Sequence, residues 1–351
     1  MKYLSIIVIA FILMLASCGE DKPIVVDRPD YNPTPYTLNF PDFLPIMDMP
    51  ADNPLTEEGI ALGRRLFYDP ILSGDNTMSC ATCHKSELSF TDERQFSEGI
   101  DGSVGNRQAM HIVNLGWTQS LFWDGRVDGL EAQALDPVEN PVEMKEDWAN
   151  AVAELSADPD YPDLFYAAFG EEKITKELAA KAIAQFERTM ISGNSLYDQV
   201  VQLNEGEFTE EEEAGFEIFN SEVGDCFHCH GTTLFTDNLF HNNGLDNEFS
   251  DIGLEKVTGN PLDKGLFKTP SLRNIELTAP YMHDGRFQTL EEVIDHYSDG
   301  LVNSPTIDPL MLQISHGGLR LDAEQKAQLI AFLKTLTDTS FVNNPAFQSP
   351  F

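Results

Sequence analysis

The sequence carries one pattern twice, CATCH at residues 80–84 and CFHCH at residues 226–230. Cys-x-x-Cys-His is the attachment signature of c-type haem, in which two thiols bond to the haem and the adjoining histidine binds the iron. A zinc site would need its second pair of ligands closer, and a disulfide in so tight a loop would constrain little unfolded chain. The pattern therefore predicts two covalently bound haem c groups, one at Cys80, Cys83 and His84 and the other at Cys226, Cys229 and His230. In the second motif, the spacing selects His230 rather than His228 as the iron ligand.

The composition excludes several classes of protein. The 351 residues include 22 Lys and Arg against 58 Asp and Glu, which gives a formal charge of −36. Such a chain lacks the clustered basic residues that bind the phosphates of DNA or RNA, so we expect no nucleic acid partner. It is repelled by anionic membrane surfaces, but it attracts a partner that carries a basic patch. The length suits about two domains.

The first residues read as an export signal. Lys2 precedes an apolar run over residues 6–15 and a small-residue cleavage site before Cys18. This stretch resembles a bacterial lipoprotein lipobox, which implies a signal peptide over residues 1–17 and a stable anchor of acyl chains on Cys18; a signal peptide with a chance cysteine is the alternative. Residues 18–48 are polar and rich in proline, as in a flexible tether. We therefore expect an exported, periplasmic protein that touches a bacterial membrane only through this lipid anchor.

The two halves of the chain repeat each other around the haem motifs. A helix start at Thr56 precedes the first motif, and another at Thr209 precedes the second, where Glu212 completes a capping box. Each half closes with an amphipathic helix, one near residues 174–190 and one that opens at Asp322. No alternating run typical of a strand is long enough to predict a sheet.

These repeats predict an all-α fold of two tandem cytochrome c-like domains from an internal duplication, each with one covalently bound c-type haem. The expected boundaries are residues 49–200 for the N-terminal domain, residues 201–341 for the C-terminal domain, and residues 342–351 for a tail.

Two longer blocks carry a resemblance to a known family. They are FWDGRVDGLEAQALDPVENPVEM at residues 122–144 and TPSLRNIELTAPYMHDGRFQTLEEVIDHY at residues 269–297. Together with the two haem motifs, they resemble the bacterial dihaem cytochrome c peroxidase family, which also contains MauG, an oxidase of tryptophans in a partner protein. The resemblance covers about residues 50–340. It implies that hydrogen peroxide is reduced to water at the N-terminal haem, and that a six-coordinate C-terminal haem passes the electrons.

The resemblance implies that one position in each half faces the distal side of its iron. When Asp124 is aligned with Asp284, an offset of 160, this position is Pro137 in the first half and Tyr297 in the second. Proline has no donor atom, so the first iron keeps an open position, whereas the phenolate of Tyr297 can ligate the second iron. The alternative second ligands are Met311, Met282 and His296, with Tyr297 as an ordinary buried tyrosine.

Three further residues take roles from the resemblance. Glu143 matches the distal acid–base group of the family, and Gln133 matches an amide of the same pocket. A carboxylate can take a proton from one peroxide oxygen and give it to the other, and burial beside a haem would raise its pKa. The rival carboxylates are Glu139 and Glu131. Trp123 matches the tryptophan between the haems, where it either relays electrons or only packs between the domains.

The resemblance also implies a Ca²⁺ site between the domains. The family uses oxygens equivalent to those of Thr278 and Pro280, which suit this hard cation, and it usually adds an asparagine after an arginine. Here the pair is Arg107-Gln108, so the amide oxygen would come from Gln108.

Two departures from the family bear on function. Many members carry a histidine after the first haem motif that blocks the iron until the second haem is reduced, but residues 85–108 contain neither His nor Met. We therefore predict a first haem that reacts without prior reduction, and His111, just beyond the loop, leaves the question of a block open. The tryptophan that MauG carries two residues before the second motif is Gly224 here, which favours a plain peroxidase.

The sequence thus leads to three candidate functions. The first is a peroxidase that draws electrons from a small periplasmic cytochrome c or cupredoxin with a basic patch. The second is a MauG-like oxidase of a partner protein, and the third is a dihaem electron carrier without turnover. Pro137 and Glu143 argue against the carrier, because a carrier has no use for an open iron beside a proton donor. The sequence identifies neither the donor nor the oligomeric state, and a homodimer stays open.

Overall fold

The computed structural model describes residues 29–351. The predicted signal peptide and the predicted anchor at Cys18 lie outside these residues. Within the described part of the chain, no helix is both long enough and apolar enough to cross a membrane. Residues 31–351 cluster as one unit by their contacts, and the fold below is that of this unit.

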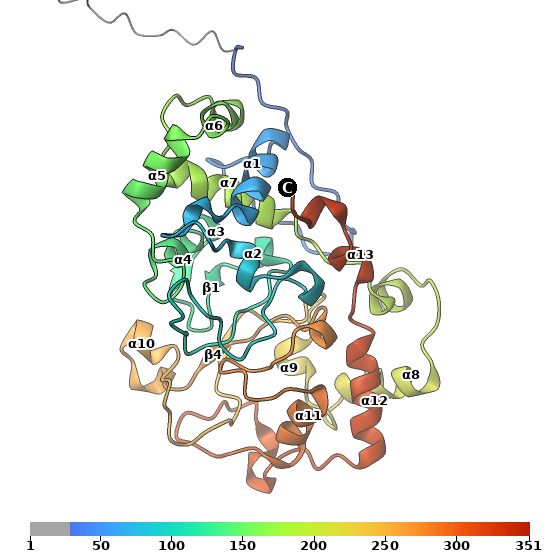
Figure 1. The fold of residues 1–351 in the computed structure, drawn as a ribbon. Helices are drawn as coiled ribbons and strands as arrows, with labels where there is room; N and C mark the ends of the chain where they lie inside the picture. The colour runs from blue at the N-terminus through green and yellow to red at the C-terminus, as the bar shows by residue number, and fades with distance from the viewer. Residues whose placement is uncertain (1–28) are drawn as a thin grey trace, which may run out of the picture. The chain divides into compact units, whose positions relative to one another are not determined.

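The structure is helical with very little sheet (Figure 1), as the sequence predicted. The helices are α1 (Glu57–Tyr68), α2 (Cys80–Cys83), α3 (Leu130–Gln133), α4 (Asp136–Glu139), α5 (Trp148–Ala157), α6 (Tyr161–Phe169), α7 (Lys176–Arg188), α8 (Glu210–Phe219), α9 (Phe227–His230), α10 (Glu255–Thr258), α11 (Leu290–Asp299), α12 (Ala323–Lys334) and α13 (Thr339–Val342). Two antiparallel pairs of short strands join them, β1 (Ser120–Leu121) with β2 (Val127–Asp128) and β3 (Phe240–His241) with β4 (Phe267–Lys268).

The predicted helix starts are confirmed where their capping residues lie. The Thr56 hydroxyl accepts from the Gly59 backbone N–H at the start of α1. At the start of α8, Thr209 and Glu212 form the expected capping box, and Asp322 caps α12. The helix expected near residues 174–190 begins at Lys176, because the Thr175 side chain caps it there.

Each half is built on a crossed pair of helices, α1 with α7 in the first half and α8 with α12 in the second. A glycine sits at each crossing. A Cβ on Gly63 would collide with the Ala182 carbonyl of α7, and a Cβ on Gly215 would collide with the Gln328 carbonyl of α12. Only glycine allows backbones to approach so closely. The haem motifs lie at α2 in the first half and at α9 in the second.

Both ends of the described chain pack on the first half. Residues 29–48, expected as part of a tether, are without helix, but Leu44 and Met47 are buried. After α12 the chain returns towards α1 (Figure 1), where Phe341 and Phe347 join a cluster around Phe67. The last residues, expected only as a tail, therefore help to cover the first core.

Candidate active site

The first haem motif occupies α2, a single helical turn. His84 follows directly, and its Nδ1 lies 2.8 Å from the Phe90 carbonyl oxygen. A carbonyl only accepts, so Nδ1 carries the proton and Nε2 presents its lone pair to a metal. None of the four described cysteines forms a disulfide. Both observations fit a haem bonded to Cys80 and Cys83.

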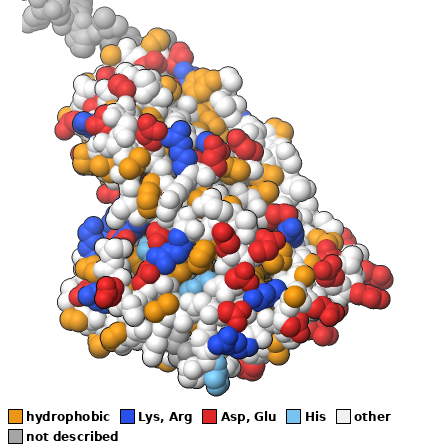
Figure 2. All heavy atoms as spheres, turned by 60° about the horizontal axis from the view of Figure 1, so that its bottom comes forward, with side chains coloured by type: hydrophobic (Ala, Val, Ile, Leu, Met, Phe, Trp, Pro, Cys, Tyr) orange, Lys and Arg blue, Asp and Glu red, His pale blue; other side chains and the backbone are white. Residues whose placement is uncertain are grey.

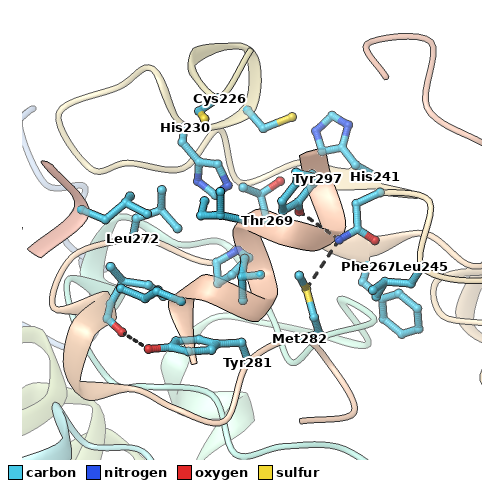
Figure 3. Close-up of a pocket in the computed structure, with 18 of the residues that line it drawn as sticks. Cys226, His230, His241, Leu245, Phe267, Thr269, Leu272, Tyr281, Met282 and Tyr297 are labelled. Atoms are coloured by element: carbon cyan, nitrogen blue, oxygen red, sulfur yellow. Dashed lines mark hydrogen bonds between the residues drawn. The ribbon is translucent and has the colours of Figure 1, made fainter. Parts of the chain in front are cut away.

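The second motif repeats this arrangement on α9 and the residue before it. His230 Nδ1 lies 2.8 Å from the Phe235 carbonyl oxygen, and its ring enters the cavity drawn in Figure 3 beside Cys226. His228 points elsewhere, with its Nδ1 2.5 Å from Asp225 Oδ1. The two histidines therefore differ in position: His230 lines the cavity, and His228 is not among its described lining residues.

A cavity of about 800 Å³ lies against the first motif. His84 and Cys83 line it, and so do the three distal residues expected there: Gln133 at the end of α3, Pro137 in α4 and Glu143 in the turn after α4. These residues are up to 59 positions from His84 in the sequence, and the fold brings them to one cavity. A haem held by His84 would therefore have a carboxyl, an amide and a proline in the walls around it.

Glu143 is the titratable group best suited to handle protons in this cavity. Its side chain is partly buried, and its Oε1 accepts from the Asn140 amide at 2.6 Å. Burial raises the pKa of Glu143 to about 7, with the charge of Asp136 adding to the rise and Arg126 opposing it. A group with this pKa is populated in both protonation states near neutral pH, as an acid–base catalyst requires.

The rival carboxylates are placed less favourably. Glu139 also lines the first cavity, but its side chain is exposed to solvent. Glu131 binds Arg188 through two contacts of 2.7 and 2.8 Å and accepts from Asn53. It does not appear in the described lining of the cavity.

The second cavity, of about 220 Å³, lies against His230 and brings in Tyr297 from α11 (Figure 3). The Tyr297 hydroxyl accepts from the Asn243 amide at 3.0 Å, and the same amide nitrogen lies 3.6 Å from Met282 Sδ. Burial raises the pKa of Tyr297 to about 12, so a nearby metal cation would be needed to ionise it near neutral pH. Met311 also lines this cavity, and it stays an alternative ligand.

His296, the remaining alternative ligand, lies on α11 next to Tyr297. Its Nε2 is 3.2 Å from the Asn243 carbonyl oxygen, and it is not among the described residues that line the second cavity. Of the four predicted candidates for this position, the cavity therefore contains Tyr297, Met311 and Met282.

A common wall separates the two cavities. Seven residues line both of them: Gln108, Met110, His111, Trp123, Lys268, Pro270 and Ser271. Trp123 is buried, and its indole N–H donates to the Gln108 carbonyl at 2.8 Å. The predicted position of Trp123 between two haem sites thus corresponds to this wall.

Comparison with known proteins agrees with this geometry. The sequence profile of the family described as di-haem cytochrome c peroxidase matches residues 57–206. The methylamine utilization protein MauG of Methylorubrum extorquens is 38% identical over 300 residues, which are 82% of this chain and 80% of that protein. This chain belongs to the di-haem cytochrome c peroxidase family.

Other similar proteins include a cytochrome c peroxidase and a MauG-like protein. Cytochrome c551 peroxidase of Nitrosomonas europaea is 31% identical over 87% of this chain and 86% of its own length. The crystal structure of a MauG-like protein associated with microbial copper homeostasis matches with a TM-score of 0.83 at 39% identity, covering 90% of this chain and 99% of that one. Membership makes the protein an oxidoreductase with haem cofactors, hydrogen peroxide as its substrate and a redox partner.

The residues expected to bind Ca²⁺ line one cavity of this dihaem peroxidase. Gln108, Thr278 and Pro280 all line the second cavity. The Gln108 amide nitrogen donates to Thr91 Oγ1 at 2.7 Å, which leaves its amide oxygen as an available ligand. The donor set is oxygen, as Ca²⁺ prefers, although none of the three is a carboxylate.

His111 lines both cavities, including the first one, which also contains Gln133, Pro137 and Glu143. It is buried in the common wall, where burial together with the charges of Lys268 and His84 lowers its pKa to about 3. Its electrostatic neighbours are Lys268 and His84.

Gly224 lines the second cavity at the position where MauG carries its tryptophan. A Cβ on Gly224 would collide with the Ile218 carbonyl oxygen. The chain therefore has no room for a larger side chain at this point unless the backbone moves.

The sequence analysis missed three residues of the second site. Asn243 binds Tyr297, His241 is held between Asp237 and Asp308 at 2.8 and 2.6 Å, and Lys268 lies in the common wall. The only sequence signal for Lys268 is that it directly follows the apolar residues Leu266 and Phe267. The other two depend on contacts between distant segments.

Proposed function

We propose that this protein reduces hydrogen peroxide at a covalent haem c held by Cys80, Cys83 and His84. A second covalent haem c, held by Cys226, Cys229 and His230 and capped by Tyr297, delivers the electrons. The observation that carries the proposal is the asymmetry between the cavities. Pro137 and Glu143 face the first, and the matching Tyr297 enters the second.

Haem iron supplies peroxide binding and electron transfer in such a site, and the chain supplies the proton chemistry. Glu143 accepts a proton from peroxide as its carboxylate and returns it to the departing oxygen, which leaves as water. Asn140 holds one carboxyl oxygen of Glu143 through the 2.6 Å hydrogen bond. Gln133 offers an amide to orient the substrate from the same cavity.

Trp123 is the proposed route for electrons between the haems. It is buried, lines both cavities and is held by Gln108. Its backbone carbonyl accepts from the Lys268 N–H at 2.9 Å, which ties it to β4. An aromatic ring fixed in this wall shortens the gap that electrons must cross.

The remaining proposals concern organisation and partners. The glycine at each helix crossing supports an internal duplication into domains at 49–200 and 201–341. Thr278, Pro280 and Gln108 would hold Ca²⁺. Export to the periplasm with a lipid anchor at Cys18 follows from the sequence of residues 1–18.

The proposed electron donor is a small cytochrome c or cupredoxin with a basic patch. Acidic side chains gather along the right-hand edge of the face in Figure 2, and the whole chain has a formal charge of −36. Association with a basic donor would be steered by this charge, so its rate should fall as salt rises.

The test uses the full-length protein isolated with its haems. Mass spectrometry should find two haems per chain, and the oxidised, as-purified protein should consume peroxide without prior reduction. Two low-spin haems and no reaction with peroxide would instead show an electron carrier.

A MauG-like oxidase is the second candidate, favoured by the relatives named MauG. It would oxidise a partner protein after peroxide treatment rather than a cytochrome. Gly224 opposes it, because the chain lacks the tryptophan that MauG carries at this position.

A further inference from the structure

Lys268 is a buried cation at the boundary of the two haem sites. It ends β4, and its side chain is 4% exposed. The pairing of β4 with β3 places it opposite Phe240, and its backbone N–H donates to the Trp123 carbonyl. The strand pair therefore fixes Lys268 in the wall that both cavities share.

No carboxylate pairs with Lys268. Within residues 29–351, no ion pair reaches its Nζ. Asp237 is the carboxylate that interacts with it electrostatically, but Asp237 is already bound to His241 at 2.8 Å. Burial lowers the pKa of Lys268 to about 8, which shows how poorly the chain alone solvates the ammonium group.

The other cations near the cavities are already neutralised or exposed. In the first cavity, Arg107 binds Asp124 and Asp251, and Arg126 binds Asp124 and Asp136. Among the described residues of the second cavity, Lys268 is the only Lys or Arg. An unpaired buried charge is costly, so we expect the bound cofactors to supply its anion.

We propose that Lys268 Nζ binds a haem propionate in the wall between the two cavities and thereby raises the reduction potential of that haem. Each haem brings two propionate carboxylates, and they are the anions that would enter these cavities. A positive charge beside a haem favours the reduced form, because reduction adds an electron. This inference rests on the proposed function, since it requires both haems.

The experiment compares the reduction potentials of both haems in the full-length holoprotein and in Lys268→Met, with Lys268→Arg as the variant that keeps the charge. Haem content is measured first: fewer than two haems in the wild-type protein would refute the proposed function, not this inference alone. With two haems present, we expect Lys268→Met to lower the reduced-to-oxidised ratio of at least one haem about tenfold at a fixed potential. This corresponds to a fall of about 59 mV in the reduction potential of that haem. The haem whose reduction potential falls is the one whose propionate binds Lys268.

The matched control is Lys256→Met, because Lys256 also lines the first cavity but is exposed to solvent. It should leave both potentials near the wild-type values, and Lys268→Arg should shift them less than Lys268→Met. Unchanged potentials in a fully loaded Lys268→Met protein would overturn the inference. If that variant does not fold, a crystal structure of the wild-type holoprotein decides: a propionate oxygen within about 4 Å of Nζ supports the ion pair, and a greater distance excludes it.

Discussion

Replacing Glu143 by glutamine keeps the shape of the side chain but removes its ability to accept a proton. The Asn140 contact at 2.6 Å and the place in the first cavity can both persist, because an amide oxygen also accepts. General acid–base groups typically contribute 10²–10⁴-fold to a rate. We therefore expect Glu143→Gln to lower peroxide turnover by about 10²–10⁴-fold, equivalent to about 3–5 kcal/mol in the barrier.

The pH dependence follows from the surroundings of Glu143. Burial and Asp136 hold the pKa of Glu143 at about 7, so the carboxylate that accepts the first proton becomes available as pH rises through about 7. Wild-type activity should rise over this interval, and Glu143→Gln should lose the rise. Asp136→Asn removes a negative neighbour and releases Arg126 from its 2.9 Å contact. Both changes favour the ionised carboxylate, so the rise should move to lower pH.

The assay is stopped-flow reduction of peroxide by a small cytochrome, measured between pH 5 and 9 with two haems per chain confirmed for each variant. Glu139→Gln is the matched control, because Glu139 lines the same cavity from an exposed position. It should keep both the rate and the profile. Wild-type turnover in Glu143→Gln, or an unchanged inflection near pH 7, would refute the role of Glu143.

Three other changes test separate parts of the structure. Tyr297→Phe removes the hydroxyl that Asn243 binds, so the low-spin spectrum of the second haem should change; an unchanged spectrum would exclude Tyr297 as ligand. Trp123→Phe removes the hydrogen bond to Gln108 and should slow electron transfer between the haems in a flash-reduction measurement, whereas an unaltered rate would leave Trp123 a packing role. Burial raises the pKa of Glu187 to about 8, and its Oε2 has no described partner. The folded protein therefore binds the proton of the Glu187 carboxyl more tightly than the unfolded chain does. The free energy of unfolding should fall by up to about 1.4 kcal/mol per pH unit as the pH rises from about 4.3 to 8. Denaturant unfolding of Glu187→Gln should show a smaller decline over that range, and an identical decline would contradict the buried, protonated state.

Local signals predicted much of the framework. A threonine followed by two glutamates defines a helix start through its own side chain, so Thr56 and Thr209 could be read directly. The repeat offset of 160 paired Pro137 with Tyr297, and the structure places them in different cavities. These features depend on neighbouring residues or on an internal repeat, which the sequence displays.

The remaining features depend on contacts between distant segments. Strands of two residues are too short to show an alternating pattern, so the pairing that places Lys268 opposite Phe240 could not be predicted. Asn243 reaches Tyr297 across 54 positions, and Phe347 packs near Phe67 across most of the chain. Such contacts are created by the packed core rather than by local propensity.

In the proposed function, the two halves use similar scaffolds for opposite tasks, and the difference between them lies in side chains. His84 and His230 each direct Nδ1 to a carbonyl at 2.8 Å, so their proximal sides are alike. Because the helix crossings at Gly63 and Gly215 are also alike, the backbone gives little reason for one iron to react and the other not to. The contrast instead comes from Pro137, which offers no donor atom, and Tyr297, whose oxygen enters the second cavity. In the proposed function, a peroxide site and an electron-entry site therefore share a similar scaffold and differ through substitutions that leave the packing of each half intact.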